Sequence, residues 1–82
     1  MKLTIYSKSG CPYCSKIKQV AEHLSEDKGY FVVVYELGEH FSREQFYEEF
    51  GQGSTFPQVI LNDKHLGGCT DTVKYLQENN LL

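Results

Sequence analysis

The stretch Ser9-Gly10-Cys11-Pro12-Tyr13-Cys14 places two cysteines two residues apart, where a short strand is expected to end and a helix to begin. Proline at the first helical position loses no hydrogen bond, because the N–H that it lacks has no intrahelical partner there. Unpaired backbone N–H groups and the positive end of the helix dipole favour an anion at this point, and the thiolate of Cys11 is such an anion. The stretch therefore predicts a reactive thiol at the start of a helix.

The segments on either side of the cysteine pair predict a strand and then an amphipathic helix. Residues 2–6 alternate between apolar and polar side chains, as a strand does, and residues 7–10 interrupt that alternation. Residues 12–28 then repeat apolar side chains every three or four positions, which is typical of a helix with one buried face. These apolar residues are Cys14, Ile17, Val20, Ala21 and Leu24. We expect Cys14 to be buried and Cys11 to lie at an exposed tip, so that the two thiols differ in acidity.

The next segment predicts a second strand. Residues 30–35 form a continuous β-branched and aromatic run, which is the composition of a strand that is covered on both faces. The helix predicted before it is long enough for the crossover that joins two parallel strands. The first part of the chain therefore predicts a βαβ unit.

Two patterns predict the start of a second helix over residues 43–50. Ser42 and Gln45 have the spacing of a capping box, in which each side chain bonds the backbone N–H of the other residue. Phe41 and Phe46 have the spacing of a hydrophobic staple across the same helix start. Both patterns indicate that the helix begins directly after the serine.

The last third of the chain predicts a hairpin and a helix. Residues 58–61 and 64–66 are strand-like, and Asn62-Asp63 between them tolerates the positive φ of a tight turn. We expect Thr70 or Asp71 to cap the final helix. The predicted order is β-α-β-α-β-β-α, an α/β fold with three helices and four strands.

Length, charge and cysteine count restrict the function. We expect residues 1–82 to form a single domain. The net charge of −3 and the absence of Lys/Arg runs argue against nucleic acid or a membrane surface as the main partner. No apolar run approaches the roughly 20 residues of a membrane span. The chain has three cysteines, and two of them are separated by only two residues. This arrangement fits a redox or metal role in a reducing compartment better than a secreted disulfide framework. We therefore expect a monomeric cytoplasmic protein.

Three motifs in this order carry a family resemblance: Cys11-Pro12-Tyr13-Cys14, Thr55-Phe56-Pro57 and Gly67-Gly68-Cys69-Thr70-Asp71. Together with the predicted element order, they resemble the dithiol glutaredoxins of the thioredoxin fold over nearly the whole chain. The resemblance implies a four-stranded mixed sheet in which the first two strands are parallel and the hairpin is antiparallel to them. It also implies a cis peptide bond before Pro57.

The resemblance further implies a glutathione-dependent thiol-disulfide oxidoreductase, which is an enzyme. The helix-start position assigns Cys11 as the nucleophile, and Cys14 then resolves the mixed disulfide. Glutathione acts as the reducing co-substrate, and we expect no tightly bound cofactor and no metal. The implied partners are disulfide-bearing or glutathionylated proteins, and ribonucleotide reductase is a common one in the family.

The resemblance also assigns a glutathione site with three parts. The backbone at Phe56 pairs with the cysteinyl residue, and valine is the commoner residue at this position. Thr70 and Asp71 hold the γ-glutamyl end, because a helix start and a carboxylate suit a zwitterion. Lys8 and Tyr13 contact the glycyl carboxylate. The full set assigned to glutathione is Lys8, Tyr13, Thr55, Phe56, Pro57, Cys69, Thr70 and Asp71.

Simpler structural interpretations stand beside some of these assignments. Pro57 fits a proline at a strand entry, and Asp71 fits a plain helix cap. Lys8 fits a solvated lysine at a strand end. Cys69 fits a small buried residue, a spare thiol open to glutathionylation, or a backbone contact to the ligand.

Other functions remain open for the cysteine pair. A thioredoxin-like reductant recharged by a flavoprotein reductase usually carries Trp and Gly-Pro around its cysteines, whereas this chain has no Trp and reads Pro12-Tyr13. An iron-sulfur carrier would bridge a cluster between two subunits through Cys11 and glutathione, and such relatives tend to have smaller residues between the cysteines. Two buried structural cysteines are a further alternative. A structural zinc site is disfavoured, because the other candidates supply no second closely spaced ligand pair. Those candidates are Cys69, His23, His40 and His65.

Overall fold

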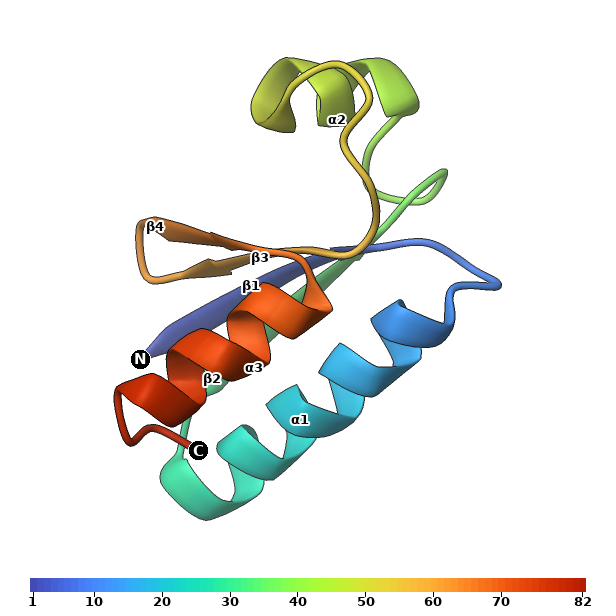
Figure 1. Ribbon diagram of the computed structural model, residues 1–82. Helices are drawn as coiled ribbons and strands as arrows, with labels where there is room; N and C mark the ends of the chain where they lie inside the picture. The colour runs from blue at the N-terminus through green and yellow to red at the C-terminus, as the bar shows by residue number, and fades with distance from the viewer.

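Four strands form one mixed sheet in the order β2-β1-β3-β4, as the computed structural model of residues 1–82 shows (Figure 1). Strand β1 pairs in parallel with β2 and antiparallel with β3, and β4 pairs antiparallel with β3. The predicted order and strand directions are confirmed. The elements are β1 (Lys2–Ser7), α1 (Pro12–Lys28), β2 (Phe31–Glu36), α2 (Arg43–Phe50), β3 (Gln58–Leu61), β4 (Lys64–Gly67) and α3 (Cys69–Glu78).

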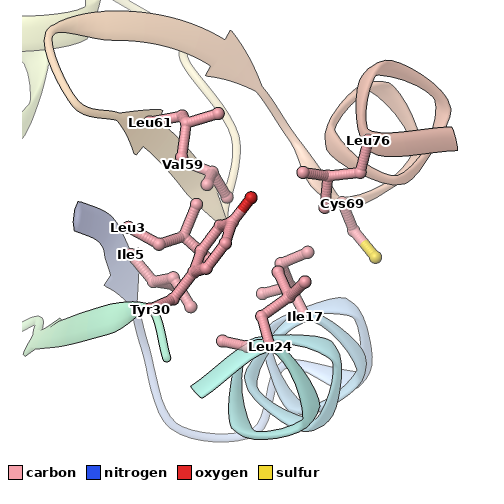
Figure 2. Close-up of a cluster of buried hydrophobic side chains, with 10 residues drawn as sticks. Leu3, Ile5, Ile17, Leu24, Tyr30, Val59, Leu61, Cys69 and Leu76 are labelled. Atoms are coloured by element: carbon pink, nitrogen blue, oxygen red, sulfur yellow. The ribbon is translucent and has the colours of Figure 1, made fainter. Parts of the chain in front are cut away.

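The main core lies between the sheet and the two helices that cover one of its faces, α1 and α3 (Figures 1 and 2). Leucine, isoleucine and valine side chains from β1, α1, β3 and α3 meet there, and several are fully buried. Full burial of each such side chain contributes about 1.5–3 kcal/mol. The fully buried members are Leu3, Ile5, Ile17, Leu24, Val59 and Leu76. This layer fixes the direction of α1, and therefore the place where its first turn meets the end of β1.

Strand β2 differs from the prediction that both of its faces are covered. It is an edge strand, all of its residues are at least partly exposed, and Phe31 is 66% exposed. Val32 and Val34 pack against the core, whereas the alternate side chains point to the face opposite α1 and α3. Only α2 lies on that face, at one end of the sheet (Figure 1). An apolar run is therefore compatible with an edge strand as well as with a central one.

Helix α2 begins as predicted. The Ser42 hydroxyl accepts a hydrogen bond from the Gln45 N–H at 3.2 Å, and the Gln45 side-chain oxygen accepts one from the Ser42 N–H at 2.9 Å. The rings of Phe41 and Phe46 stack with centroids 5.8 Å apart, which is the predicted staple. Phe50 adds an edge-on contact of 4.9 Å to Tyr6 of β1. Aromatic rings therefore attach this helix to the sheet.

Helix α3 begins two or three residues earlier than predicted. Gly68 is its N-cap, and no side chain makes a capping hydrogen bond, so the prediction that Thr70 or Asp71 caps the helix is wrong. Asp71 instead occupies the first turn and folds back over Gly67. Gly67 has φ +103°, and a Cβ there would lie 3.0 Å from a carboxylate oxygen of Asp71. The glycine is needed for this close approach.

The hairpin turn is confirmed, with Asn62 at φ 54°. None of the three helices combines the length and the apolar character that a membrane crossing requires.

The capping box at the start of α2 gives a first test. Ser42→Ala removes an acceptor for a helix N–H and should lower the free energy of unfolding by about 1 kcal/mol. Urea unfolding monitored by circular dichroism measures the loss. Ser25→Ala, on the exposed side of α1, is the matched control and should cause no loss, because alanine favours helix. An equal loss in both variants would mean that the cap does not stabilise the fold.

Candidate active site

The two cysteines of the first motif lie at the N-terminus of α1. Cys11 is the N-cap residue, Pro12 is the first helical residue, and the Cys11 sulfur accepts a hydrogen bond from the Cys14 N–H at 3.2 Å. A disulfide joins Cys11 and Cys14, whose Cα atoms are 5.1 Å apart. Cys14 is 1% exposed, whereas Cys11 is only half-buried. The predicted difference in exposure is confirmed, and Cys11 carries the sulfur that solvent can reach.

The second motif lies directly beside that sulfur. The peptide bond between Phe56 and Pro57 is cis, as the resemblance implies, and the carbonyl oxygen of Phe56 lies 3.9 Å from the Cys11 sulfur. Pro57 is fully buried. The loop before β3 therefore presents its backbone to the reactive end of α1, although the two segments are 45 residues apart in the sequence.

The third motif completes a cavity of about 170 Å³. The start of α3 forms one wall of this cavity, and the cis-proline loop and Tyr13 form the others. Of the eight residues that the resemblance assigns to glutathione, seven line this cavity and Lys8 does not. Gly68 also lines it; this residue belongs to the third motif but is not among the residues that the resemblance assigns to glutathione. The lining residues are Tyr13, Thr55, Phe56, Pro57, Gly68, Cys69, Thr70 and Asp71.

Lys8 lies next to the cavity, because its ammonium group sits 5.5 Å from the centre of the Phe56 ring. The same ring stacks on Phe46 of α2, with centroids 4.1 Å apart and planes 11° apart, and on Phe41 at 6.1 Å. Stacked pairs contribute about 0.5–1.5 kcal/mol beyond the area they bury. The phenyl group at position 56 therefore attaches the cis-proline loop to α2 and also contacts the Lys8 ammonium group.

Cys69 is the only cysteine outside the disulfide, and it is buried in the main core (Figure 2). Burial raises the pKa of its thiol, and the charge of Lys16 opposes that rise only in part. The thiol is therefore protonated at neutral pH and weakly nucleophilic. These facts favour the interpretation of Cys69 as a small buried residue.

A polar cluster that the sequence did not reveal lies where β1 ends, directly before the cysteine loop in the chain. The Lys18 ammonium group of α1 pairs with a carboxylate oxygen of Glu36 at 2.6 Å, and the Ser7 hydroxyl donates to the same oxygen at 3.4 Å. These contacts join α1 to the ends of β1 and β2. No local pattern marks the ion pair, because its members are 18 residues apart. No group of three or more His, Cys, Asp or Glu side chains is arranged to hold a metal ion.

The fold and the cysteine pair beside a cis-proline define a thioredoxin-fold thiol-disulfide oxidoreductase. Residues 3–66 match the family model for glutaredoxin. The chain is 34% identical to glutaredoxin 1 of Escherichia coli (strain K12) over 82 residues, covering 96% of each chain. It therefore belongs to the glutaredoxin family.

Other relatives and solved structures agree with this membership. Glutaredoxin-C4 of Arabidopsis thaliana is 40% identical over 80 residues, which cover 98% of this chain and 58% of the relative. The structure of reduced Escherichia coli glutaredoxin superposes with a TM-score of 0.82 at 31% identity, covering 98% of each chain. A buckwheat glutaredoxin-glutathione complex superposes with a TM-score of 0.74 at 28% identity, covering 96% of this chain and 71% of that one.

The ion pair between Lys18 and Glu36 predicts a pH-dependent stability. The hydrogen bond from Lys18 lowers the pKa of Glu36 in the folded protein, although burial opposes this. A lowered carboxyl pKa stabilises the fold above the unfolded pKa of about 4.5, and the stabilisation is lost as pH falls through the folded value. Glu36→Gln should therefore cost about 0.5–1 kcal/mol at pH 7 and progressively less below pH 4.5.

Urea unfolding between pH 7 and pH 3 measures this dependence. Glu22→Gln changes an exposed α1 carboxylate that has no ion pair. The difference in free energy of unfolding between this variant and the wild type should therefore not depend on pH. A loss in Glu36→Gln that stays constant across the pH range would contradict the ion-pair explanation.

Proposed function

We propose that this glutaredoxin reduces protein disulfides and protein-glutathione mixed disulfides with glutathione as the electron donor. The observation that carries the proposal is the convergence of the cis-proline backbone and the start of α3 on one cavity, beside the half-buried sulfur of Cys11. A cysteine pair alone would suit any disulfide. A cavity with a peptide-binding backbone and an anion-binding helix start suits a small γ-glutamyl peptide.

The cavity offers partners for both chemical parts of glutathione. The backbone of Phe56 at the cavity can pair with an extended peptide, as a strand edge does. The backbone N–H groups at the start of α3 favour a carboxylate, and the Asp71 carboxylate beside them favours an ammonium group. The γ-glutamyl end of glutathione carries both groups on one carbon.

The charges around the cavity also favour glutathione, which is a net anion at neutral pH. The chain as a whole has a net charge of −3, yet two lysines lie at the cavity. Lys8 lies over Phe56, and Lys16 lies over the ring of Tyr13 at 5.5 Å. Neither lysine is engaged in an ion pair, since the two ion pairs of the chain involve other residues. Both remain available to the glycyl carboxylate.

The reaction follows from the two sulfurs. The Cys11 thiolate, which the helix start and the Cys14 N–H stabilise, attacks a substrate disulfide and expels one substrate thiolate. The Cys14 thiolate then attacks the Cys11 sulfur, which releases the second substrate thiolate and forms the Cys11–Cys14 disulfide. One glutathione opens this disulfide, and a second removes the first as oxidised glutathione. A protein-glutathione mixed disulfide is reduced through Cys11 alone, because its glutathionyl sulfur is transferred to Cys11.

Cysteine substitutions separate these steps. In an assay coupled to glutathione reductase and NADPH, Cys11→Ser should abolish the reduction of every substrate, because the attacking sulfur is lost. Cys14→Ser should retain reduction of a glutathione mixed disulfide while losing most of the reduction of an intramolecular protein disulfide, which needs the second sulfur.

The same assay distinguishes glutathione from another electron donor. A wild-type protein that is silent with glutathione, but active with a flavoprotein thioredoxin reductase, would overturn the proposed donor. Equal loss of both activities in Cys14→Ser would instead overturn the assignment of the two cysteines and leave the donor in place.

Asp71 tests the proposed γ-glutamyl contact. Asp71→Asn should raise KM for a glutathione mixed disulfide about five- to tenfold with little change in kcat, because a charge-assisted hydrogen bond to the amine is lost. Asp63→Asn removes an equivalent charge from the hairpin turn, away from the cavity, and should leave KM unchanged. Urea unfolding of both variants checks that the packing over Gly67 persists. An unchanged KM in Asp71→Asn would exclude the contact.

A further inference from the structure

A second cavity, of about 250 Å³, is lined by residues of β1, β2, α2 and the segment between β2 and α2. Helix α2 lies on the face of the sheet opposite α1 and α3 (Figure 1). The second cavity shares no lining residue with the 170 Å³ cavity beside Cys11, which we call the cysteine cavity. Its apolar lining is aromatic, with Tyr6 from β1 next to Tyr35 and Phe41 at centroid distances of 5.3 and 5.2 Å. Phe46 of α2 completes this aromatic lining. Nothing in the proposed glutathione reaction uses the cavity.

The polar groups of this cavity give it a single negative charge. Glu49 of α2 is the only lining residue with a formal charge, and it makes no ion pair. The Nδ1 atom of His40 accepts a hydrogen bond from the Glu36 N–H at 2.9 Å. Burial raises the pKa of Tyr6, and the Glu49 carboxylate raises it further, so the field of that carboxylate reaches the aromatic lining. The cavity therefore combines aromatic rings with an unpaired carboxylate.

We propose that this cavity is a docking site for an arginine side chain in an extended segment of a partner protein. A guanidinium group lies flat against aromatic rings and donates two parallel hydrogen bonds to a carboxylate, so it matches the rings and Glu49 together. A lysine ammonium group is more strongly hydrated and lacks the planar fork, which makes it the poorer match.

The surface next to the cavity suits the peptide chain on either side of the arginine. A hollow of about 540 Å³ shares Tyr6, Tyr35 and Glu49 with the cavity and continues across the sheet past Thr4 and Ile60 to the hairpin turn. The charged side chains at that far end, Lys2 and Asp63, are of opposite sign. The open face of β2, β1 and β3 therefore extends the site along the sheet. The net charge of −3 favours the approach of a basic segment.

Peptide titration tests the site directly. The probes are acetyl-Gly-Gly-Arg-Gly-Gly-amide and the same peptide with citrulline, which keeps the shape of arginine and removes its charge. Added to the oxidised, ¹⁵N-labelled protein, the arginine peptide should shift the amide signals of Tyr6, Tyr35 and Glu49 in a saturable way. The citrulline peptide should bind roughly three- to tenfold more weakly, since it loses the ion pair and most of the cation–π attraction.

Two neighbouring glutamates on α2 supply the matched control. Glu49→Gln should weaken binding of the arginine peptide by a similar factor and leave binding of the citrulline peptide unchanged. Glu48→Gln removes the same charge one residue earlier, where the side chain lies outside both hollows, and should change neither peptide. Equal binding of the two peptides, equal weakening by the two variants, or shifts confined to other residues would each overturn the proposal.

This test is independent of the proposed glutathione reaction, because the oxidised protein binds the probe without glutathione or turnover. Glu49→Gln should also keep wild-type kcat and KM on a small glutathione mixed disulfide. Loss of that activity in Glu49→Gln would mean that the residue supports the fold of the cysteine cavity, and would overturn its assignment as a docking residue.

Discussion

The Cys11 sulfur accepts the backbone N–H of Cys14, and this short contact fixes the geometry on which the rest of the site depends. It makes the nucleophile the N-cap of α1, so that the free N–H groups and the dipole of the helix act on one sulfur atom. Packing of α1 against the sheet then decides that Cys14 is buried and Cys11 is not. The chemical difference between two identical side chains thus arises from the direction of a single helix.

Aromatic packing gives the cis-proline loop its attachment to the body of the protein. The loop between α2 and β3 contains few residues that could hold it by burial alone, apart from Pro57. Phe56 adds a ring that stacks on Phe46 and Phe41, and these rings contact Tyr6 of β1. A valine at position 56 would present no ring to this stack. The aromatic side chain therefore fits the position that α2 takes in this chain, and it places Lys8 at the edge of the cleft.

Local patterns predicted those parts of the fold whose causes are local. The capping box at Ser42, the turn at Asn62 and the three-and-four spacing of α1 each depend on neighbouring residues, and each is confirmed. The predicted start of α3 and the predicted burial of β2 were wrong. The backbone conformation at Gly67 and the position of a strand within the sheet both depend on elements that are distant in the sequence. The ion pair between Lys18 and Glu36 could not be predicted for the same reason, since its two members come from different elements. The cysteine cavity could be predicted only through the family resemblance, since the spacing of its three motifs in the sequence does not show that they meet.

The two proposed sites have opposite charge, and one side chain connects them. Lys8 and Lys16 lie at the cysteine cavity, whereas Glu49 lines the cavity under α2. An anionic peptide and a cationic segment therefore do not compete for the same surface. Phe46 lines the second cavity and stacks on Phe56, which lines the first. Because Phe46 is 1% exposed and packs against several rings, it fixes the separation of the two cavities.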